Sequence, residues 1–323
     1  MKQIAVSFLM IFLTCLVALG QFEQIIIPGD LKQQTVITEP VTLRKGYLRS
    51  GIEAAFITVN KMFDEDGQRN YYQNTNAWGK FRGFSLSTQY GLSDKFEISL
   101  RIPYVTQQYL TSTKVEEVYH DEDTLITFRS TGNGIGDIEA GIRFQIIEES
   151  SDLPSMTAGL DLTVPTGRKN PTNIKNELEY DYPTGDGNVA LGINIDFRKT
   201  IYPYSIRLRS YYEHYFKGNK ILYPGEAETE FKDGDMFIVR GNFSVHLNDW
   251  IAVWNDISYT RFGESTYYYD IQMTSPANWS LDYNPALFFQ IRRIRFLQGI
   301  IIPLIGRNHG ADPAYIFGLQ YTF

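Results

Sequence analysis

The last nine residues of the chain, Tyr315-Ile316-Phe317-Gly318-Leu319-Gln320-Tyr321-Thr322-Phe323, alternate between two kinds of side chain. Counting back from Phe323, every second residue is aromatic or leucine, and the residues between them are polar or small except for Ile316. Successive side chains of a β-strand point to opposite faces of the strand. This stretch therefore predicts a strand with one apolar face and one mostly polar face.

The same period of two recurs along the chain. In 96–104 the even positions are aromatic or aliphatic, whereas Glu97, Ser99, Arg101 and Pro103 occupy the odd positions. No segment of comparable length shows the period of 3.6 that is typical of an amphipathic helix. The pattern predicts twelve strands, at 46–60, 84–92, 96–104, 136–146, 156–164, 189–197, 204–216, 237–247, 251–260, 279–291, 294–305 and 315–323.

The connections between these strands alternate in length. Long polar connections fall at 61–80, 105–133, 166–187, 217–235 and 262–278, with a shorter one at 306–312, and short connections separate them at 92–95, 147–154, 198–203, 247–250 and 292–293. Strands of about ten residues joined in this way are typical of a transmembrane barrel. The fold expected is therefore all-β, an antiparallel transmembrane β-barrel of about twelve strands with short periplasmic turns and long extracellular loops.

A closing strand that ends on Phe323 resembles the C-terminal signature of bacterial outer-membrane barrels. The resemblance implies that the barrel-assembly machinery recognises this strand, and that the chain resides in the outer membrane of a Gram-negative bacterium. Its surface partners would then be outer-membrane lipid and lipopolysaccharide. Aromatic residues agree with this interpretation, because Tyr90 and Trp250 fall at short-turn ends and Tyr104 and Trp279 at long-loop ends, as expected for two interfacial girdles.

The N-terminal residues predict export of the chain. Residues 1–20 combine Lys2, an apolar core and the small-x-small site Ala18-Leu19-Gly20, which is the pattern of a signal peptide cleaved after Gly20. The apolar stretch is too short for a membrane anchor, and Thr14 before Cys15 disfavours a lipoprotein site. Residues 21–44 would be a periplasmic segment or a partial plug of the lumen, and 45–323 the barrel.

Composition excludes several classes of protein. Cys15 is the single cysteine and lies in 1–20, so the exported chain would have neither a disulfide nor a cysteine metal site. Lys2 is the one charged residue of 1–20, which leaves 29 basic residues against 37 acidic ones. An acidic balance of this kind argues against a nucleic-acid partner.

Three stretches together resemble a known family. They are Ser87-Thr-Gln-Tyr-Gly-Leu-Ser-Asp-Lys-Phe-Glu-Ile-Ser-Leu-Arg-Ile-Pro-Tyr104, Gly134-Ile-Gly-Asp-Ile-Glu-Ala-Gly-Ile-Arg-Phe144 and Gly159-Leu-Asp-Leu-Thr-Val-Pro-Thr-Gly167. This is similar to the "putative MetA-pathway of phenol degradation" family of outer-membrane barrels, over about 80–200. The resemblance implies uptake of small compounds, including hydrophobic or aromatic ones, and assigns no site residues.

The inward phase of the strands is rich in charge. It contains nine arginines and nine carboxylates: Arg49, Arg101, Arg143, Arg198, Arg207, Arg209, Arg240, Arg292, Arg295, Glu53, Glu97, Asp137, Glu139, Asp161, Asp196, Glu213, Asp256 and Asp282. An arginine facing lipid at mid-depth would cost about 2–4 kcal/mol, so their shared phase places them inside. The candidates for a constriction in the lumen are Arg101, Arg143, Arg207, Arg209, Arg240, Arg295, Glu97, Asp137, Glu139, Asp161 and Asp196.

Two interpretations of this interior remain open. The charges could select solutes in a narrow polar pore, or they could brace the lumen and nearly close it. The chain would accordingly be an outer-membrane channel or transporter for small solutes, or a structural or binding barrel with a closed lumen. The solute itself is unknown.

Catalysis and cofactors are not expected. A lipid hydrolase needs a nucleophile beside a base, and the best pair is Ser244 and His246, two residues apart on one strand near its short-turn end. Acidic groups at 64–66, 121–123 and 226–230 lack the spacing of a Ca²⁺ loop and are interpreted as solvated charge, with divalent bridging to surface lipid as the alternative. The sequence predicts no enzyme, no metal site and no cofactor.

Overall fold

The computed structural model describes residues 42–71, 78–116, 123–176, 179–221, 225–268 and 272–323. These residues form strands, turns and loops, and none of them lies in a helix long and apolar enough to cross a membrane. The predicted signal peptide and most of 21–44 fall outside the described residues.

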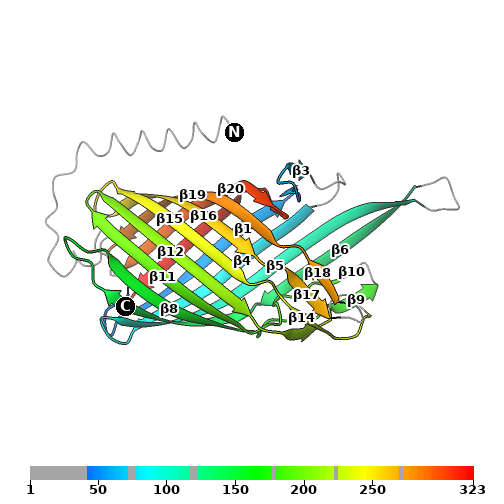
Figure 1. Ribbon diagram of the computed structural model, residues 1–323, viewed down its shortest axis with the longest axis horizontal. Coiled ribbons are helices and arrows are strands. Elements are labelled where there is room, and N and C mark those ends of the chain that lie inside the picture. The colour runs from blue at the N-terminus through cyan, green and yellow to red at the C-terminus, as the bar shows by residue number, and fades with distance from the viewer. Residues whose placement is uncertain (1–41, 72–77, 117–122, 177–178, 222–224, 269–271) are drawn as a thin grey trace.

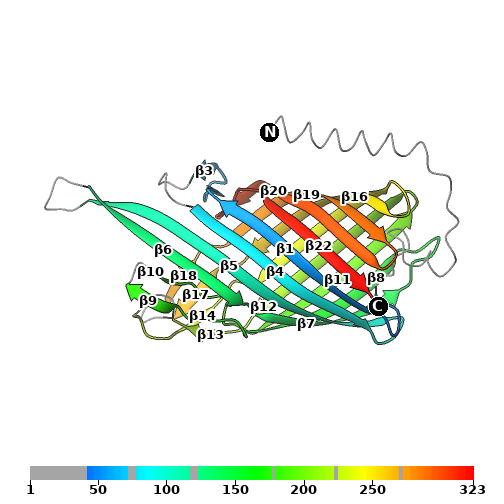
Figure 2. The same cartoon turned by 180° about the vertical axis from the view of Figure 1, so that it is seen from behind.

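Twelve strands close into an antiparallel barrel (Figures 1 and 2). Each hydrogen-bonds to two neighbours, and pairing of β4 with β5 completes the ring. The strands are β1 (Leu48–Val59), β4 (Trp78–Gly91), β5 (Phe96–Glu116), β7 (Ile138–Ile147), β8 (Ser155–Val164), β11 (Ala190–Ile201), β12 (Tyr204–Tyr215), β15 (Met236–His246), β16 (Ile251–Phe262), β19 (Asn278–Ile291), β20 (Ile294–Arg307) and β22 (Ala314–Thr322). Every one of the twelve predicted strands overlaps one of these, which confirms the predicted fold class.

The long connections contain more β-structure than the sequence predicts. Within the predicted loop 105–133, the described residues instead form the outer part of β5 paired with β6 (Asp123–Ile135), and these two strands project beyond the barrel rim (Figure 2). Shorter strands occupy the other long connections: β2 (Lys61–Phe63), β3 (Arg69–Tyr71), β9 (Thr172–Asn176), β10 (Glu179–Asp181), β13 (Gly218–Lys220), β14 (Thr229–Lys232), β17 (Ser265–Tyr268), β18 (Gln272–Ser275) and β21 (His309–Gly310). These hairpins lie outside the apolar band, where water is on both faces and no hydrophobic alternation marks a strand.

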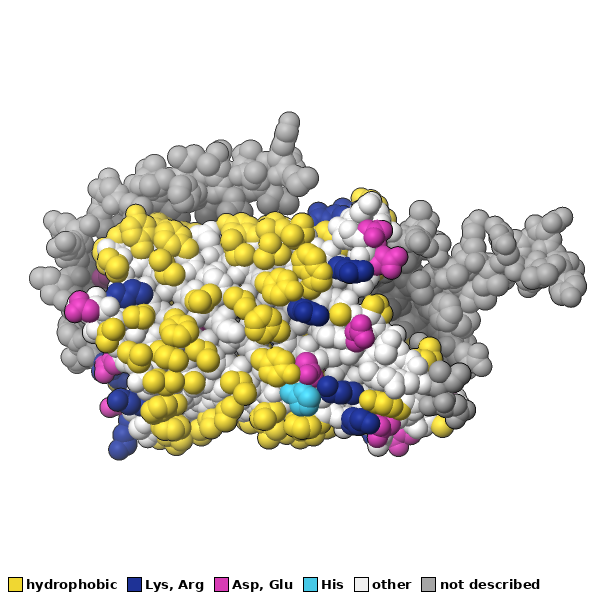
Figure 3. All heavy atoms as spheres, in the orientation of Figure 1, with side chains coloured by type: hydrophobic (Ala, Val, Ile, Leu, Met, Phe, Trp, Pro, Cys, Tyr) yellow, Lys and Arg dark blue, Asp and Glu magenta, His cyan; other side chains and the backbone are white. Residues whose placement is uncertain are grey.

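The barrel is apolar outside and polar inside. In β11, Ala190, Gly192, Asn194 and Asp196 are buried, whereas Leu191, Ile193, Ile195 and Phe197 are exposed. Figure 3 shows the resulting apolar surface as a band across the barrel wall. This reversal of the usual pattern of a water-soluble protein is expected where lipid, rather than water, faces the outer surface.

The girdle aromatics point outward on this surface. Tyr90, Tyr204, Trp250 and Tyr321 are exposed near the short-turn end, and Tyr104, Tyr212 and Tyr315 are exposed toward the long-loop end. Rings with one polar atom prefer the boundary between lipid and water. The two sets therefore mark the edges of the apolar band.

The ladder between β19 and β20 contains one irregularity. Pro285 lacks an N–H group in the middle of the predicted strand 279–291, so a bulge or a frayed ladder is expected around it. On the β16 side the register runs without interruption through Asn255 opposite Pro285. On the β20 side it shifts between Leu281 and Asp282, where Pro303 lies opposite Asp282. The shift thus lies beside Pro303, which also lacks an N–H donor.

Candidate functional site

Two adjoining cavities run along the interior of the barrel. The larger, about 1450 Å³, lies at the end of the long loops, and we call it the loop-side cavity. The second, about 580 Å³, lies toward the short turns and is called the turn-side cavity. Phe81, Arg101, Pro103 and Val105 line both cavities and form the junction between them.

Carboxylates dominate the charged lining of the loop-side cavity. It has five of them, Asp137, Glu139, Asp186, Glu213 and Glu226, and two cationic side chains, Arg101 and Lys220. Asp137 fixes the loop wall, because its two carboxylate oxygens accept hydrogen bonds from the backbone N–H groups of Gly167 at 2.9 Å and Asp186 at 2.7 Å. It therefore lies in the wide mouth, away from the junction.

The acidic surroundings affect the pKa of Asp186. Asp186 lines the loop-side cavity. Desolvation by the surrounding loops raises the pKa of its carboxyl group to about 6, and the neighbouring carboxylates of Asp233 and Asp137 act in the same direction. The mouth should therefore gain negative charge as the pH rises through 6.

Arginine dominates the turn-side cavity. Eight arginines line it, against three carboxylates: Arg49, Arg101, Arg143, Arg198, Arg207, Arg209, Arg240 and Arg295, with Glu53, Glu97 and Asp256. The two cavities are lined by charges of opposite sign because different positions along the strands line the barrel at each depth. Along the barrel axis, the charged lining is therefore mainly acidic at the long-loop end and mainly basic toward the short turns.

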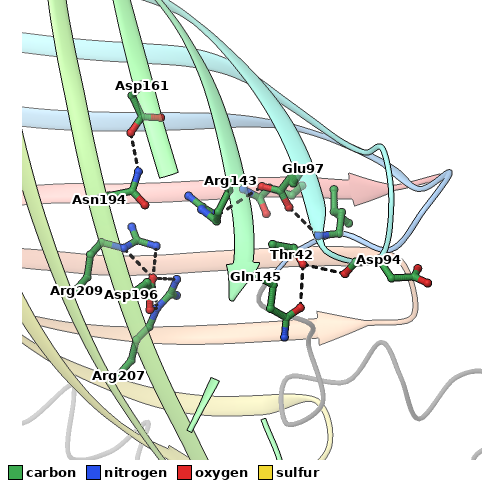
Figure 4. A network of polar contacts seen from close by, with 12 residues as sticks. Thr42, Asp94, Glu97, Arg143, Gln145, Asp161, Asn194, Asp196, Arg207 and Arg209 are labelled. Atoms are coloured by element: carbon green, nitrogen blue, oxygen red, sulfur yellow. Dashed lines mark hydrogen bonds and ion pairs between the residues drawn. The ribbon is translucent and has the colours of Figure 1, made fainter. Parts of the chain in front are cut away.

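Asp196 holds two of these arginines (Figure 4). Its side chain is 1% exposed, and Arg207 Nε lies 2.8 Å from each of its carboxylate oxygens. Arg209 Nε donates to Asp196 Oδ2 at 3.0 Å. Asp196 projects from β11 and both arginines from β12, so the cluster joins neighbouring strands within the wall.

Glu97 connects the barrel wall to the residues that precede β1. Its Oε1 lies 3.5 Å from Arg143 Nη1, and its Oε2 accepts the backbone N–H of Leu43 at 2.7 Å (Figure 4). Thr42 Oγ1 donates to Gln145 Oε1 at 3.1 Å, and Thr42 and Leu43 are buried. Residues 42 and 43 therefore lie against inward-facing side chains at the short-turn end, while 21–41 are outside the described residues.

The remaining predicted residues also face inward. Arg101 pairs with Glu139 at 3.5 Å across β5 and β7, and Asp161 accepts Asn194 Nδ2 at 2.8 Å. The guanidinium carbon of Arg295 lies 5.1 Å from the ring centre of Phe288. Arg292, by contrast, is exposed on the β19–β20 turn, because the turn ends the alternation on which its inward assignment depended.

The barrel interior also contains aromatic side chains that are not predicted from the sequence. Trp254 stacks on Phe288, with ring centres 4.7 Å apart and an interplanar angle of 5°. Tyr211 and Tyr215 line the loop-side cavity beside Glu213. Trp254 shares its strand phase with Asp256, so the same alternation that located Asp256 would have placed this ring inside.

The possible hydrolase pair has no catalytic geometry. Ser244 Oγ donates to Asn242 Oδ1 at 2.6 Å, and neither ring nitrogen of His246 has a hydrogen-bond partner in the described part of the chain. Across the same residues, no group of His, Cys, Asp or Glu is arranged to hold a metal. Two of the acidic loop residues pair with lysines instead, Glu228 with Lys169 at 2.6 Å and Glu230 with Lys217 at 2.8 Å.

Comparison with known proteins places the fold. No family model and no curated protein matches the chain. Among solved structures, an outer membrane channel from Pseudomonas putida F1 is similar with a TM-score of 0.65 at 11% identity, over 93% of this chain and 100% of that one. The CymD monoaromatic hydrocarbon channel reaches a TM-score of 0.45 at 6% identity, over 87% and 88% of the two chains.

These likenesses are informative about architecture alone. At 11% identity the first shows a shared barrel fold, and the second is too weak to carry an argument. The family resemblance noted in the sequence therefore agrees with the comparisons at the level of an outer-membrane barrel.

Proposed function

We propose that this chain forms a channel in the outer membrane of a Gram-negative bacterium, through which small solutes permeate. The observation that carries the proposal is the pair of adjoining cavities, about 1450 Å³ and 580 Å³, which share the lining residues Phe81, Arg101, Pro103 and Val105. A barrel with an apolar outer band and a polar interior of this size suits passage of solutes across a membrane. Orientation follows from the loops, with the loop-side cavity facing the exterior.

The pattern of ion pairs favours an open lumen over a braced one. Glu97 lies opposite Arg143 and Arg101 opposite Glu139 in the pairing of β5 with β7, and Asp196 lies opposite Arg209 in the pairing of β11 with β12. These pairs connect strands that are already neighbours in the wall. Bracing of the lumen would need partners from opposite sides of the barrel, which these three pairs do not supply.

The solute class suggested by the family resemblance, hydrophobic or aromatic compounds, stays part of the proposal. The P. putida protein of similar fold is described as an outer membrane channel, which supports a transport role. Catalysis is not proposed, because Ser244 bonds to Asn242 and not to His246.

Conductance in planar bilayers tests the channel. We expect stable open steps from the purified protein, and higher single-channel conductance from Phe81→Ala, because the ring of Phe81 lies at the junction between the cavities. Phe144→Ala is the matched control, since Phe144 is 39% exposed on the lipid side of β7. Silence from all three folded proteins would favour the closed barrel and refute the proposal.

Outer-membrane lipid, lipopolysaccharide and the barrel-assembly machinery remain proposed partners. The assembly machinery would recognise β22. Phe323, the residue after this strand, donates its backbone N–H to the carbonyl oxygen of Leu48 at 2.7 Å. A photo-crosslinking residue at Tyr321 should capture a component of that machinery during assembly, and its failure to do so in growing cells would count against this partner.

A further inference from the structure

The turn-side cavity contains arginines placed directly opposite each other. Arg198 lies opposite Arg207 in the pairing of β11 with β12, and Arg209 lies opposite Arg240 in the pairing of β12 with β15. Like charges directly opposite on neighbouring strands destabilise a sheet. Four guanidinium groups on three consecutive strands therefore need a stabilising counter-charge.

Among the described residues, two carboxylates form salt bridges with three of these four arginines. Asp196 serves both Arg207 and Arg209, and Glu149 pairs with Arg198 at 3.1 Å. No salt bridge or hydrogen bond joins Arg240 to any residue that the structure describes. Asp256 lines the same pocket, and both Asp256 and Asp282 act on Arg240 electrostatically, but neither of these carboxylates forms a salt bridge with it.

Further hydrogen-bonding groups converge on the same place. A pocket of about 160 Å³ next to the turn-side cavity is lined by these four arginines together with His246 and Trp254. His246 is 4% exposed, and both of its ring nitrogens are without a partner among the described residues. The Trp254 indole N–H is also buried and unpaired there. Buried polar atoms in native proteins almost always have partners. The guanidinium groups and the indole N–H are donors, and a neutral imidazole adds one N–H, so the pocket presents hydrogen-bond donors that suit an anion.

We infer that this pocket binds small organic carboxylates and makes the channel selective for anions. Guanidinium groups match the planar carboxylate with paired hydrogen bonds, and the stacked rings of Trp254 and Phe288 offer an apolar wall for the carbon skeleton. The inference rests on the proposed channel for its transport aspect, whereas binding itself does not require conduction.

Binding is tested on the folded full-length barrel in detergent, with succinate and its neutral isostere succinamide as probes. Succinate should change the fluorescence emission of Trp254, and succinamide should leave it unchanged. The contribution of Trp254 is the part of the fluorescence that Trp254→Phe removes. Arg240→Ser should weaken succinate binding roughly tenfold, because it removes a charged hydrogen-bond donor. Arg293→Ser, which removes the same charge from the exposed β19–β20 turn, should leave binding unchanged.

Thermal unfolding of the same variants excludes a folding defect. Arg240→Ser should unfold at the same temperature as the natural protein or a higher one, because it relieves the like-charge pair with Arg209. Equal affinity of the natural protein and Arg240→Ser for succinate would overturn the site. So would equal binding of succinate and succinamide.

Selectivity is measured separately in bilayers under a KCl gradient. The natural protein should prefer chloride to potassium, and Arg240→Ser should shift the reversal potential toward zero, while Arg293→Ser should not. Open steps without anion preference would overturn the selectivity and keep the channel. Succinate binding without any open steps would keep the site and refute the channel, so the two proposals fail in different ways.

Discussion

Replacing Asp196 with asparagine should lower the free energy of unfolding of the barrel by about 3 kcal/mol, which is the lower end of the cost of breaking a buried ion pair. The carboxylate is 1% exposed and accepts hydrogen bonds from two arginines. Asparagine keeps the size of the side chain and removes its charge. Arg207 and Arg209 would then face Arg198 and Arg240 without their shared carboxylate.

The measurement is the temperature at which the folded form converts to the unfolded form on SDS gels, or a urea titration in micelles. Glu228→Gln is the matched control, because its pair with Lys169 is solvent-exposed, with half of the glutamate side chain accessible, and exposed pairs contribute only about 0–1 kcal/mol. Adding Arg207→Ser to Asp196→Asn should recover part of the loss, since one uncompensated charge disappears. An Asp196→Asn barrel as stable as the natural one would show that Asp196 is not the counter-charge of the cluster.

Replacing Leu208 with arginine should destabilise the inserted barrel by about 2–4 kcal/mol, because an arginine at mid-depth then faces hydrocarbon. The two residues beside it in the sequence, Arg207 and Arg209, are natural arginines that face the lumen. Leu208 is 49% exposed on the outer surface. Neighbouring positions should therefore differ sharply in whether they accept the same side chain.

Ile238→Arg is the control for this change. Ile238 belongs to the adjacent strand β15, lies opposite Tyr211 and lines the loop-side cavity, so an arginine there enters a polar space. Folding into lipid vesicles, followed by protease protection, should separate the two variants, with Leu208→Arg recovered mostly unfolded. Equal yields of the two would contradict the assignment of inside and outside on which the barrel depends.

The twelve strands could be predicted from the sequence because lipid imposes a rule on every second residue. An outward side chain such as Leu208 must be apolar and its neighbours Arg207 and Arg209 can be charged, so the pattern survives without knowledge of any partner strand. The rule stops at the edge of the hydrocarbon. The hairpin of β5 and β6 was therefore interpreted as a loop, and Arg292 on a turn was assigned to the lumen.

Which charged side chains contact each other cannot be predicted from this alternation. The alternation of apolar and polar side chains predicts that Asp196, Arg207, Arg209 and Arg240 face inward. It does not predict the stagger between neighbouring strands. The register of β11, β12 and β15 decides that Asp196 faces Arg209 and that Arg209 faces Arg240.

Side-chain direction is thus a local property of an extended backbone, readable one residue at a time. The division of the interior into an acidic loop-side cavity and a basic turn-side cavity depends on the stagger between neighbouring strands and on the closure of the barrel. Those are set by hydrogen bonds between strands distant in sequence, so only the assembled barrel shows them.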